Sequence, residues 1–263
     1  MGILNVTPDS FSDGGRYFDR ALAVKRAQEM AEEGADIIDV GGESTRPGSA
    51  PVPLQEEISR TIPVIEALAK NIKVPISIDT YKAEVAKRAM DAGASIVNDI
   101  SGLRFDPEMP KVVSQYKCPV VIMHIKGTPK SMQANPQYEA LIPEIMDYFR
   151  ESIRLAVESG IAEDKIIIDP GIGFGKTFDH NLEIIKNLRE FTLLEKPLLA
   201  GVSRKAFIGK ILGDAPASER LEGTAASVAI SILNGANIIR VHDVKEMRKV
   251  ALVADAVKRG REG

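Results

Sequence analysis

Cysteine is almost absent from this chain of 263 residues, which contains only Cys118. A single thiol cannot form an internal disulfide, so the fold does not depend on cross-links and the composition fits a reducing compartment, the cytoplasm. Cys118 begins the apolar run CPVVIM. That position favours a buried structural side chain over a catalytic nucleophile.

The chain also lacks the features of membrane and nucleic-acid proteins. No uninterrupted apolar run reaches the roughly 18 residues of a membrane span, and the first residues do not resemble a secretory signal. The formal net charge is only −3, and no block of like charges occurs. We therefore expect no membrane partner and no nucleic-acid partner, and we expect a small-molecule ligand instead.

Eight short apolar runs, rich in β-branched residues, predict strands. They span residues 3–6, 37–40, 76–78, 96–97, 120–123, 166–168, 198–200 and 238–241. Segments with helical periodicity lie between most of them, including 21–33, 55–70, 81–92, 142–159 and 181–190. Alternating strands and helices predict a parallel sheet, and eight such units close naturally into a barrel, whereas an open doubly wound sheet usually has fewer strands. We predict that residues 1–263 form a single α/β domain, a (β/α)₈ TIM barrel.

Polar side chains follow nearly every predicted strand. They are Asn5, residues 43–46, Asp79, Asn98, Asp99, His124, Asp169, residues 203–205, Arg240 and His242. In a barrel all of them would converge on the C-terminal face of the strands, where active sites of this fold are built. Helix capping and hydration explain one or two such residues but not a set at nearly every strand end. We therefore predict one polar pocket on that face.

The last two predicted strands carry the motifs SRK at 203–205 and RVHD at 240–243. The connections after strands 7 and 8 of such a barrel are the usual phosphate-binding region. Two cationic clusters at this place indicate a phosphorylated substrate.

Asp79, Asn98 and Asp169 together suit a heterocyclic ligand. A carboxylate can accept two parallel hydrogen bonds from an amino-pyrimidinone edge, and Asn can both donate and accept. The set therefore fits a guanine-like or pterin ring. For Asp79 alone, N-capping of the following helix is an equally good interpretation.

The segment DPGIGFGK at 169–176 contains three glycines and precedes Thr177. It is not a phosphate-binding P-loop, because Pro170 stands where that motif needs its first glycine, and the dinucleotide fingerprint has a different spacing. We expect a backbone that approaches other groups closely and carries Asp169 and Phe174 to a flat ligand. The segments 5–18 and 41–53 predict long loops, either lids over the site or surface linkers.

Seven motifs together resemble the dihydropteroate synthase family. They are NVTPDSFSDGG from Asn5, GGESTRPG from Gly41, ISIDTYK from Ile76, VNDISG from Val97, DPGIGFGK from Asp169, SRK from Ser203 and RVHDV from Arg240. They occur in the family's order and cover essentially the whole chain. The resemblance implies a (β/α)₈ barrel that joins 7,8-dihydropterin-6-ylmethyl diphosphate to 4-aminobenzoate in folate biosynthesis and releases pyrophosphate.

The resemblance also implies residue roles. Asp79, Asn98 and Asp169 match the residues that bind the edge of the pterin. Lys205 matches a lysine that contacts the pterin. Arg240 and His242 match the groups that contact the ring and the diphosphate. The pocket walls of the family are matched by Ile100, Met123, Phe174 and Gly201. Further substrate contacts are matched by Ser203 and Arg204. The aminobenzoate site is matched by Phe11, Thr45, Arg46 and Pro47. Asp79, Asp169, Lys205, Arg240 and His242 are the implied catalytic residues.

The remaining implications concern the metal and the assembly. Asn5 matches the residue that ligates Mg²⁺, and the family forms a homodimer through the last two helices. Some members have serine after the SRK lysine, whereas this chain has Ala206. A methyltetrahydrofolate-dependent methyltransferase and a non-catalytic pterin-binding protein are the alternatives. SRK, RVHD and the NVTPDSFSDGG loop favour the synthase over the methyltransferase, and the presence of Asn5, Arg240 and His242 favours it over the binding protein.

Overall fold

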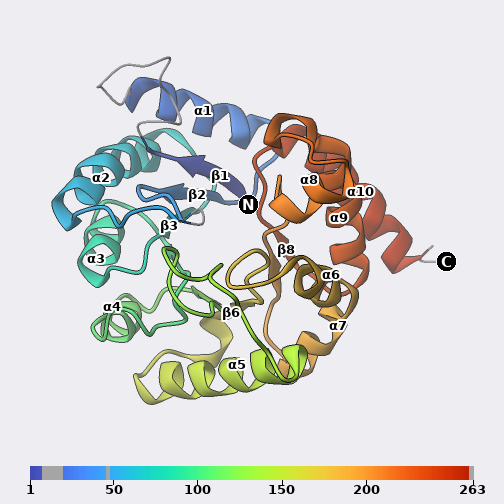
Figure 1. The fold of residues 1–263 in the computed structure, drawn as a ribbon. Coiled ribbons are helices and arrows are strands. Elements are labelled where there is room, and N and C mark those ends of the chain that lie inside the picture. Colours follow the sequence, from blue (N-terminus) through green and yellow to red (C-terminus); the bar gives the residue numbers. More distant parts are fainter. Residues whose placement is uncertain (8–19, 46–47, 261–263) are drawn as a thin grey trace.

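The computed structural model describes residues 1–7, 20–45 and 48–260, and its helices form a ring around the strands (Figure 1). The strands are β1 (Gly2–Asn5), β2 (Ile38–Gly41), β3 (Ile76–Asp79), β4 (Ile96–Asp99), β5 (Val120–Met123), β6 (Ile166–Asp169), β7 (Leu199–Ala200) and β8 (Ile238–Ile239). Each of these strands overlaps one of the eight apolar runs. The bounds differ by one or two residues, as is usual at strand ends.

All neighbouring strands are parallel, and the sheet closes on itself. β1 to β6 pair in sequence order, and β7 pairs with β8. Two bridges complete the circle, because Ile168 pairs with Leu198 and Gly2 pairs with Val241. The Ile3 N–H donates to the carbonyl of Val241 at 2.9 Å across the second junction. The predicted (β/α)₈ barrel is therefore confirmed.

The helices cover the outside of the barrel. They are α1 (Arg20–Glu32), α2 (Leu54–Asn71), α3 (Ala83–Asp91), α4 (Met109–Tyr116), α5 (Leu141–Glu158), α6 (Phe178–Lys186), α7 (Leu188–Phe191), α8 (Ala206–Ile211), α9 (Leu221–Leu233) and α10 (Val244–Arg259). The helix predicted at 181–190 is two helices. Asn187, the residue between them, leaves the helical region of backbone angles, with φ −106° and ψ 18°, and both its N–H and its side chain donate to the carbonyl of Glu183.

Glycines at helix ends allow the chain to turn tightly into the next strand. Gly93, which follows α3, has φ +112°. A Cβ at this position would lie 2.6 Å from the Cβ of Ala69 in α2. Only glycine fits here, so α2 and α3 can pack closely beside β3 and β4.

Most of the core lies between the strands and the surrounding helices, and a smaller apolar cluster fills the lower barrel interior. Val121 and Leu199 belong to the interior cluster, together with the partly buried Ile167 and Ile238. Side chains alternate along each strand, so the residue two positions after each of these also faces inward. Met123, Asp169 and Arg240 are thereby brought to the upper interior.

Two further expectations concern residues away from that face. Cys118 is buried, and burial raises the pKa of its thiol to about 11, which is consistent with the structural role predicted for it. None of the helices in the described part of the chain combines the length and apolar character needed to cross a membrane.

Candidate active site

Arg240 lies between two carboxylates at the C-terminal face of the barrel. Its Nε donates to Asp39 Oδ2 at 2.6 Å, and its Nη2 donates to Asp79 Oδ2 at 2.6 Å. Asn98 Nδ2 donates to the same oxygen of Asp39 at 3.0 Å. The guanidinium thus joins β2, β3 and the end of β8, and Asp39 adds β4 to them through Asn98. Burial acts against the charge of Arg240, but Asp39 and Asp79 outweigh it and raise the pKa of Arg240.

Asp79 does not cap the helix that follows it. The first N–H group of α3, that of Ala83, is instead bonded to Asp106 Oδ2 at 2.8 Å. Burial raises the pKa of Asp79 to about 7, although Arg240 opposes that rise. A carboxyl group poised between its two protonation states near neutral pH is typical of functional sites. The structure therefore argues against N-capping by Asp79, and its contact with a ligand stays a prediction.

Asp169 ends β6 on the opposite side of the barrel mouth and is buried. Its Oδ1 accepts the N–H of Gly171 at 2.8 Å, and burial raises its pKa. Gly171 has φ +68°, and a Cβ there would lie 1.9 Å from the carbonyl oxygen of His124. A Cβ on Gly201 would lie 3.9 Å from Asp169 Oδ2. The close backbone approach predicted for this segment is therefore present.

Lys205 and Phe174 contact each other at the same face of the barrel. The Nζ of Lys205 lies 4.3 Å from the centroid of the Phe174 ring, which is a cation–π distance. Burial lowers the pKa of Lys205 to about 8, and Asp169 opposes that change. Ile100 and Met123 belong to a separate apolar cluster against which Phe174 packs. The four predicted contacts are thus on adjoining surfaces.

His242 and Ser203 are bonded to each other at the β7 and β8 ends. The His242 backbone N–H donates to Ser203 Oγ at 3.1 Å, and Ser203 Oγ lies 2.9 Å from His242 Nδ1. If the hydroxyl donates to Nδ1, the proton of the neutral ring sits on Nε2. Burial, with the charge of Arg240, lowers the pKa of His242 to about 4. His242 is therefore a neutral hydrogen-bond donor at neutral pH.

Arg204, between Ser203 and Lys205, has a partner of its own. Its Nε donates to Asp243 Oδ2 at 2.9 Å, and its Nη2 also pairs with that carboxylate. Its φ is +55°, and its N–H is bonded to Thr224 Oγ1 at 3.0 Å. The contact of Arg204 with substrate stays a prediction.

The remaining predicted residues fall at the ends of β1 and β2. Asn5 ends β1, is half-buried and pairs in register with Gly41. Thr45 follows β2 and is half-buried. Phe11, Arg46 and Pro47 lie outside the described residues.

Two residues of this face were missed as site residues by the sequence analysis. Asp39 occurs inside an apolar run, and a charged residue within a buried strand was the available signal. Lys176 is buried, and its Nζ contacts His124 Nδ1 at 2.9 Å and the carbonyl oxygens of Gly171 at 3.1 Å and Phe174 at 2.9 Å. Lys176 thereby holds the glycine-rich segment that presents Phe174.

Comparisons with known proteins give the family. Residues 1–242 match the family model described as pterin binding enzyme. Dihydropteroate synthase of Synechocystis sp. is 50% identical over 98% of this chain and 90% of its own length. The chain belongs to the dihydropteroate synthase family. The dihydropteroate synthase of Bacillus subtilis is likewise 50% identical, over 98% of this chain and 87% of its own length.

Solved structures of this family agree with the fold. A Yersinia pestis dihydropteroate synthase in a sulfonamide drug complex has a TM-score of 0.94 at 44% identity, over 98% of this chain and 94% of that one. A Clostridium difficile dihydropteroate synthase in the presence of pteroic acid has a TM-score of 0.93 at 46% identity, over 98% of this chain and 96% of that one. A Xanthomonas albilineans dihydropteroate synthase with 4-aminobenzoic acid has a TM-score of 0.93 at 41% identity, over 99% of this chain and 93% of that one.

Proposed function

We propose that the chain is a transferase of folate biosynthesis that joins 7,8-dihydropterin-6-ylmethyl diphosphate to 4-aminobenzoate, forming 7,8-dihydropteroate and pyrophosphate. The observation that carries this proposal is the arrangement around Arg240. Buried carboxylates on β2, β3 and β6 face cationic and hydrogen-bond-donating groups from the ends of β7 and β8. One pocket can thereby hold an electron-rich ring and an anionic leaving group side by side. The lone buried thiol of Cys118 agrees with a cytoplasmic location, which is part of the proposal.

The reaction breaks the bond between the pterin methylene carbon and the diphosphate oxygen, which keeps the electron pair. Positive charge then grows on the pterin, and Asp79 and Asp169 stabilise it because they are already oriented toward the ring. Arg240 and the Nε2–H of His242 donate to the departing anion. The aminobenzoate nitrogen attacks the methylene carbon, forms the C–N bond and loses a proton. No covalent enzyme intermediate is required.

Mg²⁺ is the metal that this proposal includes, and the donor set at the barrel mouth fits it. Asn5, which ends β1, would supply one amide oxygen. Within residues 1–7, 20–45 and 48–260 there is no group of three His, Cys, Asp or Glu residues that could hold a metal by itself. Mg²⁺ is commonly held by one or two protein oxygens together with substrate phosphates and water. When bound, it would neutralise charge on the leaving group.

Replacing Asn5 with alanine is expected to raise the Mg²⁺ concentration that gives half-maximal turnover by about tenfold or more, because the protein oxygen ligand is lost. The rate of product formation against Mg²⁺ concentration measures this change. Asn71→Ala is the matched control, since Asn71 is an exposed residue at the end of α2. An unchanged metal dependence in Asn5→Ala would remove Asn5 from the metal site.

The proposed function is tested by pyrophosphate release from the purified protein given dihydropterin diphosphate, Mg²⁺ and 4-aminobenzoate, with each component omitted in turn. Release that requires metal and equals the dihydropteroate formed would support the synthase. Binding of the pterin without release would support a binding protein, and methyl transfer from methyltetrahydrofolate would support the methyltransferase. Ala206 provides no hydroxyl for the aminobenzoate carboxylate, so that contact would fall to backbone groups.

The assembly we propose is a homodimer formed by α9 and α10. These adjacent helices expose several apolar side chains, Ile230, Leu233, Leu252, Val253 and Val257. Val253 and Val257 are 66% and 67% exposed, and an apolar surface of this kind is typical of an interface. A second copy of the same surface would cover it through a two-fold axis.

A glutamate in place of Val253 is expected to shift the protein from dimer to monomer, because the introduced charge would have to be buried without a partner. Sedimentation velocity at micromolar concentration measures the change, which should raise the dissociation constant by about 10²-fold or more. Val157→Glu in α5 is the control, because Val157 is 40% exposed on another side of the ring. A variant that sediments like the wild type would argue against this interface.

A further inference from the structure

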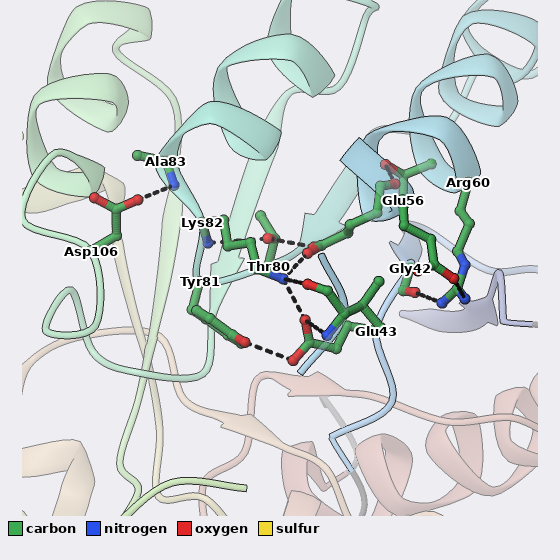
Figure 2. A network of polar contacts seen from close by, with 12 residues as sticks. Gly42, Glu43, Glu56, Arg60, Thr80, Tyr81, Lys82, Ala83 and Asp106 are labelled. Carbon is green, nitrogen blue, oxygen red and sulfur yellow. Dashed lines mark hydrogen bonds and ion pairs between the residues drawn. The ribbon is translucent and has the colours of Figure 1, made fainter. Parts of the chain in front are cut away.

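A buried cluster of one lysine and two glutamates lies at the same rim of the barrel, between the connections that follow β2 and β3 (Figure 2). Glu43 follows β2, Glu57 lies in α2, and Lys82 precedes α3. The Nζ of Lys82 forms ion pairs with both carboxylates. The Glu43 and Glu57 side chains are only 6% and 1% exposed. The cluster is therefore part of the interior, where charge pairs are screened little by water.

Glu43 and Lys82 together hold the backbone of Val52. The Val52 N–H donates to Glu43 Oε2 at 3.2 Å, and Lys82 Nζ donates to the Val52 carbonyl at 2.9 Å. The other oxygen of Glu43 accepts from the Tyr81 hydroxyl at 2.7 Å. The three hydrogens of the Lys82 ammonium thus have three acceptors, the Val52 carbonyl and the two carboxylates. Residues 43 and 52, the two ends of this segment, are therefore held together by direct hydrogen bonds and through Lys82.

Other contacts fix the same segment from outside. Arg60 Nη1 donates to the carbonyl of Gly42 at 2.8 Å, and Arg60 also pairs with Glu56 (Figure 2). The Gly48 N–H donates to the carbonyl of Pro129 at 3.1 Å, in the connection after β5. The segment is therefore held at its beginning, at its end and at Gly48.

Holding α2 against β3 does not require Glu43. Thr80 Oγ1 donates to Glu57 Oε1 at 2.7 Å and accepts the Lys82 N–H at 3.2 Å, which already joins the helix to the strand end. The additional bonds from Glu43 and Lys82 to Val52 instead determine the distance between the two ends of segment 43–52. Thr45, a predicted aminobenzoate contact, lies two residues after Glu43 in this segment.

We propose that Glu43 and Lys82 are positioning residues for the aminobenzoate end of the site. They act by fixing the ends of segment 43–52 and thereby the place of Thr45. This inference rests on the proposed function. Pterin binding should depend little on them. Asp169 and Lys205 belong to other parts of the barrel, and Asp79, although only three residues before Lys82, is held by the hydrogen bond from Arg240. A displaced segment should therefore affect the second substrate selectively.

The test is Glu43→Gln, assayed with each substrate varied in turn. This change leaves Lys82 paired with Glu57, so no buried carboxylate loses its cation and the fold should persist. We expect the KM for 4-aminobenzoate to rise by about tenfold and the KM for dihydropterin diphosphate to stay within about twofold. Lys82→Met removes the donor to the Val52 carbonyl, so it should raise the KM for 4-aminobenzoate as well.

Glu84→Gln is the matched control, because Glu84 lies on the exposed side of α3 in an ion pair with Arg88. Equal rises in both KM values, or a lowered melting temperature with both KM values unchanged, would reduce the cluster to a structural role and overturn the inference. A folded Lys82→Met variant with an unchanged KM for 4-aminobenzoate would remove Lys82 from it. A wild-type chain that forms no dihydropteroate would instead refute the proposed function, and this inference with it.

Discussion

Replacing Lys205 with methionine is expected to lower kcat/KM by about 10²-fold to 10³-fold while the protein remains folded at ordinary temperatures. Lys205 lies over Phe174 at the wall of the proposed pterin pocket, with its Nζ 4.3 Å from the ring centroid. A preorganised donor or charge that contacts the reacting ring contributes mainly to transition-state binding. Its loss should therefore lower kcat/KM far more than it lowers stability.

The fold should tolerate this change because the Lys205 ammonium makes few interactions that stabilise the folded protein. Within the described part of the chain, no ion pair or side-chain hydrogen bond joins its Nζ to another residue, and its cation–π contact is the one direct interaction. Burial lowers its pKa to about 8, so the folded protein already disfavours the charge. Methionine has a similar length and can still cover Phe174. The melting temperature should stay within about 3 °C of the wild type.

Lys210→Met is the matched control. Lys210 lies in α8, and its Nζ is 5.0 Å from the centroid of the Phe178 ring, so the same type of contact is removed outside the pocket. Steady-state kinetics and thermal unfolding of both variants give the comparison. A Lys205→Met protein with unchanged kcat/KM, or one that unfolds at ordinary temperatures, would contradict the assignment of Lys205 to the ligand.

The pH dependence of the wild type provides a second measurement of the same residue. With a pKa of about 8 in the folded protein, Lys205 is charged below that pH and loses its proton above it. If the charged form binds the substrate, kcat/KM of the free enzyme should fall as the pH rises through about 8. Lys205→Arg keeps the charge at every pH in this range, so its profile should lack that fall.

The barrel could be predicted from sequence because its strands are short, apolar and regularly spaced. The polar residues Asp79, Asn98 and Asp169 come at strand ends, so their convergence followed from parallel pairing alone. The role of Asp39 could not be derived in the same way. Asp39 lies inside the run IIDV. Its role depends on the hydrogen bond from Arg240, which forms only because β8 closes the barrel beside β1.

The parts that escaped prediction depend on contacts between distant residues. Glu43 and Lys82 are 39 positions apart, and no periodic pattern relates them. Lys176 looked like the end of a nucleotide motif, but its ammonium is directed to His124 and to two backbone carbonyls. The break near Asn187 is a change in the backbone angles of one residue, which helical periodicity does not record. In each case geometry, and not residue type, decides the role.

Arg240→Met is expected to cause the largest combined loss, of stability and of turnover. Arg240 is the cation that faces both Asp39 and Asp79, at 2.6 Å from each. Removing one member of a buried charge network leaves the others uncompensated and costs about 3–5 kcal/mol of unfolding free energy. Turnover should fall by about 10³-fold, because the donor to the leaving diphosphate is lost as well.

The double variant Asp39→Asn with Arg240→Met separates these two effects. Asn at 39 removes one uncompensated charge, so the double variant should recover part of the lost stability and none of the lost activity. Urea unfolding and the pyrophosphate assay measure the two quantities, and the stability values of the wild type, the two single variants and the double variant form a double-mutant cycle. A double variant no more stable than Arg240→Met alone would show that Asp39 and Arg240 do not interact as described.

The stability deficit of Arg240→Met should also depend on pH in a predictable direction. Burial already raises the folded-state pKa of Asp79 from 3.8 to about 7, and losing Arg240 raises it further. A carboxyl group whose pKa is raised on folding binds its proton more tightly in the folded state, so stability is retained at low pH and lost as pH rises past its unfolded value. Asp79 is protonated in both folded proteins between about pH 4 and 6, so the deficit should stay constant there. It should grow as the pH rises through 7, where the wild type loses this proton and the variant keeps it. Urea midpoints measured across this range should separate further between variant and wild type as the pH rises, and a constant separation would show that Asp79 is not compensated by Arg240.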